Sequence, residues 1–212
     1  MTEEEARDWV YRHFDVSRET TVKIERYIEL LLAESAKQNL ITRSTQTAIW
    51  SRHIADSAQL LLLAPAASEN ALWIDLGSGA GLPGLIIAML SRWKVCLVES
   101  RAMRVQFLQA VVDELELSNV EVFGGRAETL RLDRAGTVIS ARAFAPLPKL
   151  FQSAYHLANN ETFWLLPKGK SWQSDVDAAK SVWRGVFHVE HSFTEPESAI
   201  VVAKFVRRKR AA

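Results

Sequence analysis

The sequence has few of the features that build disulfides, metal clusters and membrane spans. Its one cysteine, Cys96, excludes a disulfide framework and any zinc cluster with several cysteines, and we expect no metal. The longest apolar runs, residues 60–64 and 85–90, are far shorter than the ~20 residues of a membrane span. The first residues are acidic, where an export signal would be basic. We therefore expect a cytoplasmic protein that does not contact a membrane.

Charge of one sign is also not in excess. The 212 residues include 26 Lys+Arg and 25 Asp+Glu, which gives a formal net charge of +1. This balance excludes a protein that coats nucleic acid through bulk charge, but it is compatible with a local basic patch. Two interpretations of the basic tail stay open, a contact with RNA phosphates and a solvated terminus. The tail comprises Lys204, Arg207, Arg208, Lys209 and Arg210.

Residues 1–65 predict a helical extension. Two segments carry apolar residues at the three- and four-residue intervals of an amphipathic helix. The second segment is expected to begin at the Ser44–Thr45 cap and to end near Pro65, and residues 38–42 between the two predict a turn. The apolar positions are Ile24, Tyr27, Ile28 and Leu31 in the first segment, and Trp50, Ile54, Ala58 and Leu61 in the second.

Residues 66–212 predict an α/β domain that packs with the extension as one unit. Short apolar runs alternate with helical patterns, which indicates a parallel sheet covered by helices on both faces. The last two runs are joined by the short segment 194–197 and predict a hairpin, so an antiparallel strand closes the sheet. The seven expected strands are 71–76, 94–99, 120–123, 137–140, 162–166, 185–193 and 198–206, and the expected helices are 85–90, 101–117 and 147–157.

A glycine-rich turn follows the first expected strand. Gly79, Gly81 and Gly84 satisfy the G-x-G-x-x-G pattern, which is weak evidence by itself. Asp75 precedes the turn, and Glu99 ends the second expected strand, where a carboxylate can accept both hydroxyls of a ribose. An acidic residue before the glycines and another after the second strand are typical of Rossmann-like S-adenosylmethionine-dependent methyltransferases. A glycine turn with a purely structural role is the alternative.

Further motifs run in order across residues 38–169. The chain resembles the small-subunit ribosomal RNA methyltransferase G family, also called glucose-inhibited division protein B. Arg-His-Ile-x-Asp-Ser, Gly-Leu-Pro-Gly and Arg-Ala-Phe together are much more specific than the glycine loop. The matching segments are residues 38–40, 52–57, 75–84, 104–108, 126–128, 140–144 and 168–169.

The resemblance implies a seven-stranded Rossmann-like methyltransferase fold and a reaction. The expected reaction is methylation of N7 of a guanosine in the decoding-centre loop of 16S rRNA, with S-adenosylmethionine as the cofactor. The expected partner is 16S rRNA or the small ribosomal subunit, and we expect a monomer. The resemblance also implies cofactor contacts from Gly77, Leu82, Ala127, Glu128 and Arg142.

Guanine N7 is an exposed acceptor that needs no base to become a nucleophile, so catalysis would consist mainly of orientation. Candidate residues for this task are Arg142, Lys168 and His53. For Lys168 the alternative is a solvated loop lysine. For His53 it is a helix histidine whose hydrogen-bond partner is Asp56. Phe144 either stacks on the target base or packs in the core.

Two other classes of function are considered. A nucleotide-dependent oxidoreductase would use Gly79–Gly84 for a pyrophosphate and Glu99 for a ribose, but Asp75 and the closing hairpin disfavour it. A ribosome-assembly factor without catalytic activity would keep the fold and bind the methyl donor without transferring the methyl group.

Overall fold

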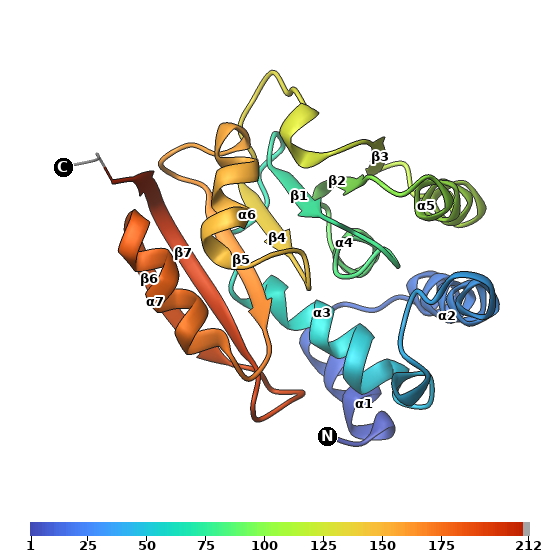
Figure 1. Cartoon of the computed structure of the whole chain (residues 1–212). Helices are drawn as coiled ribbons and strands as arrows, with labels where there is room; N and C mark the ends of the chain where they lie inside the picture. Colours follow the sequence, from blue (N-terminus) through green and yellow to red (C-terminus); the bar gives the residue numbers. More distant parts are fainter. Residues whose placement is uncertain (210–212) are drawn as a thin grey trace.

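Seven strands form a single sheet in the order β3-β2-β1-β4-β5-β7-β6 (Figure 1). The computed structural model describes residues 1–209. Strand β7 runs antiparallel to both neighbours, and the remaining pairs are parallel, which confirms the predicted sheet and its closing hairpin. The strands are β1 (Leu72–Leu76), β2 (Lys94–Glu99), β3 (Val120–Gly124), β4 (Val138–Ala141), β5 (Phe163–Lys168), β6 (Trp183–His191) and β7 (Ala199–Arg208).

Helices connect the parallel strands, and three of them were predicted. They are α4 (Gly84–Leu90), α5 (Ala102–Glu114) and α6 (Leu147–Ala154), the last continued by the 3₁₀ turn η5 (Tyr155–Leu157). A fourth helix, α7 (Trp172–Val182), was not predicted. Among its residues only Val176 and Ala179 are buried, so its apolar periodicity is too sparse to recognise. No helix in the described part of the chain is long and apolar enough to cross a bilayer.

The N-terminal helices are α1 (Glu3–His13) and α2 (Arg18–Gln38), and α2 buries the predicted Ile24, Tyr27 and Leu31. The prediction of a single second helix from residue 44 is wrong. A 3₁₀ turn, η1 (Arg43–Thr45), stands apart, and a mixed segment follows it. This segment starts only at residue 50, because the Glu3 carboxylate accepts the backbone N–H groups of Trp50 and Ser51 at 2.8 Å and so caps it there. It comprises the π-helical η2 (Trp50–Ala55), α3 (Asp56–Ala58) and the 3₁₀ helix η3 (Gln59–Leu62).

Two apolar clusters fill the two faces of the sheet. Successive residues of β1 point to opposite faces, so Trp73 joins one cluster and Ile74 the other. The Trp73 cluster holds the buried residues of the N-terminal helices together with those of α4 and α5. The Ile74 cluster is covered by α6 and α7. The extension therefore shares a core with the sheet.

Much of the basic tail belongs to the sheet and is not a frayed terminus. Lys204, Arg207 and Arg208 lie in β7, and the last two pair with Arg184 and Trp183 of β6. The Lys209 backbone N–H donates to Val182 O at 3.0 Å. Arg210 lies outside the described residues.

Helix α2 supports the glycine loop through one buried hydrogen bond. The Tyr27 hydroxyl donates to the Ala80 carbonyl oxygen at 2.8 Å, and both residues are buried. Burial raises the pKa of Tyr27, so the hydroxyl stays a donor. The loop thus depends on a residue more than fifty positions earlier in the chain.

We expect Tyr27→Phe to lower the free energy of unfolding by about 1–3 kcal/mol, because it leaves the buried Ala80 carbonyl without a donor. Urea titration measures the loss. Tyr11→Phe is the matched control: the Tyr11 hydroxyl contacts Thr21 Oγ1 at 3.0 Å in a half-buried position, where water can replace it. Equal losses in the two variants would contradict the role of Tyr27.

Candidate functional site

The glycine loop joins β1 to α4 beside β4, where the strand order of the sheet reverses. Gly77 has φ +66° and Gly81 φ +90°, in the left-handed region that favours glycine. A Cβ on Gly77 would lie 2.7 Å from Cδ2 of Phe144, so any other residue there would force the Phe144 ring to move. The loop therefore brings bare backbone to the ligand-binding edge of the sheet.

Asp75 holds this loop from beneath. Its side chain is fully buried; Oδ1 accepts the Ser140 hydroxyl at 2.7 Å and Oδ2 accepts the Gly84 N–H at 3.3 Å. The Trp73 indole N–H donates to the same Ser140 hydroxyl at 2.8 Å. Burial raises the pKa of Asp75 to about 6, and hydrogen bonds, the first from Ser140, oppose the rise. The carboxylate thus joins β1, β4 and α4.

Glu99 holds the other side of the loop. Its Oε2 accepts the Gly79 N–H at 3.0 Å, and Oε1 accepts the N–H groups of Ser100 at 2.7 Å and Arg101 at 2.9 Å. A carboxylate offers about four lone-pair directions, so one remains after these three bonds. Both ribose hydroxyls were expected at Glu99, but most of its acceptor capacity serves the backbone.

Two adjacent pockets open at this edge of the sheet. The loop pocket, about 200 Å³, is lined by Gly77, Ser100, Gly125 and the residues of η4 (Ala127–Thr129) that precede Thr129. The central pocket, about 780 Å³, lies between the η2–α3 segment, the ends of β4 and β5, α7 and the β6–β7 turn. Phe144 and Ala145 line both pockets, so the two adjoin there.

The predicted site residues divide between these pockets. The loop pocket brings together Gly77, Ala127 and Glu128. The central pocket brings together His53, Arg142 and Lys168. Leu82 and Glu99 line neither pocket: Leu82 is buried, with its backbone N–H on Ser78 O at 3.2 Å.

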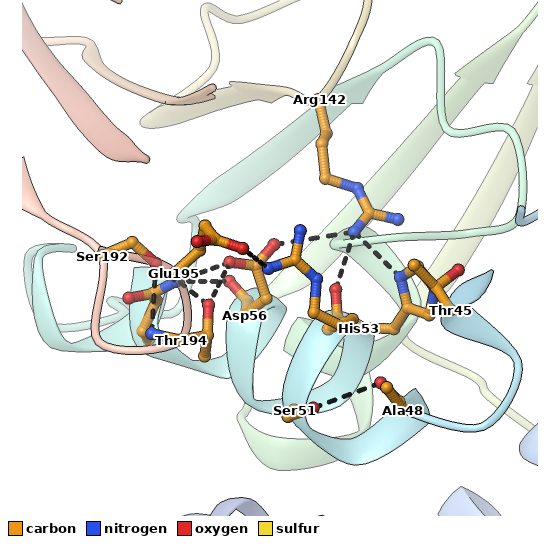
Figure 2. Close-up of polar contacts among 11 residues, drawn as sticks. Thr45, Ala48, Ser51, His53, Asp56, Arg142, Ser192, Thr194 and Glu195 are labelled. Carbon is orange, nitrogen blue, oxygen red and sulfur yellow. Dashed lines mark hydrogen bonds and ion pairs between the residues drawn. The ribbon is translucent and has the colours of Figure 1, made fainter. Parts of the chain in front are cut away.

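Arg142 follows β4 and is anchored through one nitrogen of its guanidinium, Nη1 (Figure 2). Its Nη1 donates to His53 Nδ1 at 3.2 Å and to the Arg52 carbonyl oxygen at 3.4 Å, and it lies 3.6 Å from Asp56 Oδ2. Within residues 1–209, neither Nε nor Nη2 of Arg142 has a hydrogen-bond partner. These donors are therefore available to a ligand in the central pocket.

His53 is held as a neutral ring. Because a guanidinium has only donors, His53 Nδ1 must accept the hydrogen bond from Arg142. The proton of the neutral ring is therefore on Nε2, which donates a hydrogen bond to Thr45 Oγ1 at 3.0 Å. Burial, with the positive charges of Arg142 and Arg52, lowers the pKa of His53 to about 3. The expected His53–Asp56 pair is wrong. Both ring nitrogens of His53 have other partners, and the Arg142 guanidinium contacts His53 and Asp56 alike.

Lys168, the last residue of β5, is not a solvated loop lysine. Its Nζ lies 2.7 Å from Asp175 Oδ2 and donates to the Ala145 carbonyl oxygen at 2.9 Å. An ammonium has three donors, so one remains for a ligand. Sequence reasoning missed Asp175 because it lies in α7, the helix that was not predicted. Its Oδ1 also accepts the Leu147 N–H at 2.8 Å, at the start of α6.

The β6–β7 turn completes the central pocket, and sequence reasoning treated it only as a hairpin connection. Asp56 Oδ1 accepts the Thr194 hydroxyl at 2.8 Å (Figure 2). The same oxygen accepts the Gln59 amide N–H at 2.9 Å. Arg52 forms an ion pair with Glu195 of the same turn. No motif records the contacts of Asp56 with Thr194 and of Arg52 with Glu195, because the partners in each lie more than 130 residues apart.

Comparison with protein families matches residues 20–198 to the family described as rRNA small subunit methyltransferase G. The ribosomal RNA small subunit methyltransferase G of Zymomonas mobilis subsp. mobilis is 46% identical over 216 residues, which cover 99% of this chain and 97% of that protein. The protein of the same name from Sphingopyxis alaskensis is 50% identical over 200 residues, 94% of this chain and 85% of that protein.

Solved structures share the fold. A SAM-dependent methyltransferase from Aquifex aeolicus superposes with a TM-score of 0.59 at 16% identity, over 74% of this chain and 93% of that one. TYW2 of M. jannaschii, in complex with AdoMet, superposes with a TM-score of 0.56 at 14% identity, over 74% and 76%. These likenesses confirm the predicted Rossmann-like methyltransferase fold.

We expect the stability conferred by Asp75 to depend on pH. Its folded pKa of about 6 lies above its ordinary value of 3.8, so the folded protein holds the proton more tightly. The contribution of Asp75 to the free energy of unfolding is complete below pH 3.8 and is lost as the pH rises through 6. Asp75→Asn removes this titration. Urea titrations should show wild type gaining on Asp75→Asn between pH 7 and pH 4, and a constant difference would contradict the assignment.

Proposed function

This chain belongs to the rRNA small subunit methyltransferase G family, and we propose that it methylates N7 of a guanosine in the decoding-centre loop of 16S rRNA. As a family member it is an S-adenosylmethionine-dependent methyltransferase that acts on small-subunit rRNA. The observation that carries the finer proposal is the junction of the two pockets at Phe144 and Ala145. It allows a methyl donor in one pocket to meet a base in the other.

The loop pocket suits the nucleoside part of S-adenosylmethionine. Gly77 leaves its floor without a side chain, and the half-exposed Glu128 carboxylate can accept hydrogen bonds at its rim. When bound, the cofactor supplies an electrophilic methyl group on a sulfonium sulfur. The residues proposed to contact it are Gly77, Ala127 and Glu128, which line the loop pocket, and Arg142, which lines the adjoining central pocket. Leu82 and Glu99 line neither pocket and are proposed to support the glycine loop that carries the cofactor.

In the central pocket, Arg142 and Lys168 are proposed to orient the guanine. A donor on N7 would occupy the lone pair that must form the new bond, so the free edge of Arg142 serves the reaction by donating to O6. Both nitrogens of His53 are already bonded, and its proposed contribution is to hold Arg142. Cys96 takes no part, because burial raises the pKa of its thiol to about 12. The chain's contribution is orientation.

The target base must leave its stack to enter the central pocket. We propose that Phe144, half-buried at the junction of the pockets, stacks on it. A groove of about 1200 Å³ beside the loop pocket is lined by Lys149, Arg208 and Lys209, and it supports an rRNA phosphate contact by the described part of the basic tail. We propose that the protein acts as a monomer in the cytoplasm, where its rRNA substrate is found.

The proposal is tested with purified protein, labelled S-adenosylmethionine, and rRNA or small subunits from cells that lack this protein. We expect one labelled guanosine, methylated at N7, in the decoding-centre loop. Titration should show binding of S-adenosylmethionine and not of NADH. Methylation at another atom, binding of NADH alone, or binding of the methyl donor without transfer to either form of RNA would overturn the proposal.

Arg142→Ala should lower kcat by about 10²-fold or more, the usual cost of removing one oriented donor from an active site. Single-turnover rates at saturating methyl donor and RNA measure the change. Arg12→Ala is the control, because Arg12 is an exposed residue of α1 paired with Asp8 and should leave the rate unchanged. Unchanged turnover in Arg142→Ala would remove Arg142 from the mechanism.

A further inference from the structure

The central pocket contains equal numbers of cations and carboxylates, and each cation is paired. Arg142 lies beside Asp56, and Lys168 beside Asp175, with side chains that are all at most 25% exposed. Arg52 and Glu195 form a third, more exposed pair at the rim. With His53 neutral, the lining residues together carry no net charge.

The carboxylates of the two inner pairs are fixed by further donors. Thr194 and Gln59 hold Asp56 Oδ1 and so leave Oδ2 toward Arg142. The Leu147 N–H holds Asp175 Oδ1 and leaves Oδ2 toward Lys168. The two pairs come from different elements. Asp56 is the first residue of α3 and its partner Arg142 follows β4, whereas Asp175 lies in α7 and its partner Lys168 ends β5. The neutrality of the pocket is therefore built into the fold.

Methylation at N7 changes the charge of the base. The N7 lone pair forms a bond to the methyl carbon, and the electron pair of the broken C–S bond stays on sulfur. The sulfur becomes a neutral thioether, and the guanine ring acquires the positive charge. A pocket that orients guanine with an arginine and a lysine would oppose this charge unless anions offset it, because Coulomb interactions are strong where water is excluded.

We propose that Asp56 and Asp175 stabilise the positive charge that guanine acquires during methyl transfer, so that Arg142 and Lys168 can orient the base without opposing the reaction. This role rests on the proposed N7 methylation. In this role the two aspartates speed methyl transfer through their charge. They also let the pocket bind the positively charged product as well as it binds the neutral guanine.

The test compares binding of two forms of the small ribosomal subunit, one with the target guanosine unmodified and one with it methylated at N7. In wild type we expect similar Kd values. In Asp175→Asn and Asp56→Asn the methylated form should bind about tenfold more weakly than the unmodified form at low salt, as expected for one unbalanced charge several ångström away. The single-turnover rate constant for methyl transfer at saturating subunit should fall by a similar factor. The subunit concentration that gives half of this rate should change less.

Controls separate charge from structure. Glu197→Gln removes a carboxylate that is paired with Lys170 outside the central pocket, and it should change neither the Kd ratio nor kcat. The double variant Lys168→Gln/Asp175→Asn removes both charges of one pair, so it should restore the Kd ratio even if its rate is low. Circular dichroism and the melting temperature show whether each variant is folded. If Asp175→Asn does not fold, Asp56→Asn tests the proposal.

The outcomes are distinguishable. If wild type methylates N7 and both folded aspartate variants keep the wild-type Kd ratio, the charge-balancing role is wrong and the proposed function stands. If both forms of the subunit bind more weakly by the same factor, the aspartates are only structural, and the inference is again overturned. If wild type methylates no guanosine at N7, the proposed function and this inference fall together.

Discussion

The buried hydrogen bonds of Asp75 determine the geometry of both pockets. The carboxylate joins β1 to Ser140 of β4 and to the first N–H of α4, so it sets the path of the glycine loop between them. Arg142 follows Ser140 by two residues, and its position beside the central pocket therefore depends on the same carboxylate. Burying this charge is costly, as its raised pKa shows, and hydrogen bonds that only the folded chain supplies offset part of the cost.

The N-terminal helices complete what the sheet alone leaves unfinished. The sheet supplies the glycine loop, Glu99 and Arg142, but Tyr27 of α2 supports the loop and the η2–α3 segment anchors Arg142. The capping of residues 50 and 51 by Glu3 sets where η2 begins, and through it where His53 lies. Residues that come before the first strand therefore belong to the functional site as much as the sheet does.

The sheet and the glycine loop could be predicted because their signals are local. Strand β2 agrees with the predicted 94–99 at both ends, since a buried strand is a continuous apolar run. The motif residues His53, Arg142 and Lys168 were identified, and so was Asp56, although as a partner of His53 and not of Arg142. The more distant partners Asp175 and Thr194 were not identified. Asp175 lies in a helix with little apolar periodicity, and Thr194 lies in a turn. Their roles come from contacts across the fold, and neither periodicity nor short motifs record such contacts.

The contact between Arg52 and Glu195 has a consequence for the order in which the protein is assembled. The two residues are 143 positions apart, as Asp56 and Thr194 are 138 apart, so the central pocket closes only after almost all of the chain described here has been synthesised. The loop pocket is lined by residues 77–153 and is complete in sequence earlier. During translation, the residues of the loop pocket can thus be in place before those of the central pocket. The ribosome that synthesises the chain therefore meets it without a finished central pocket until translation is nearly complete.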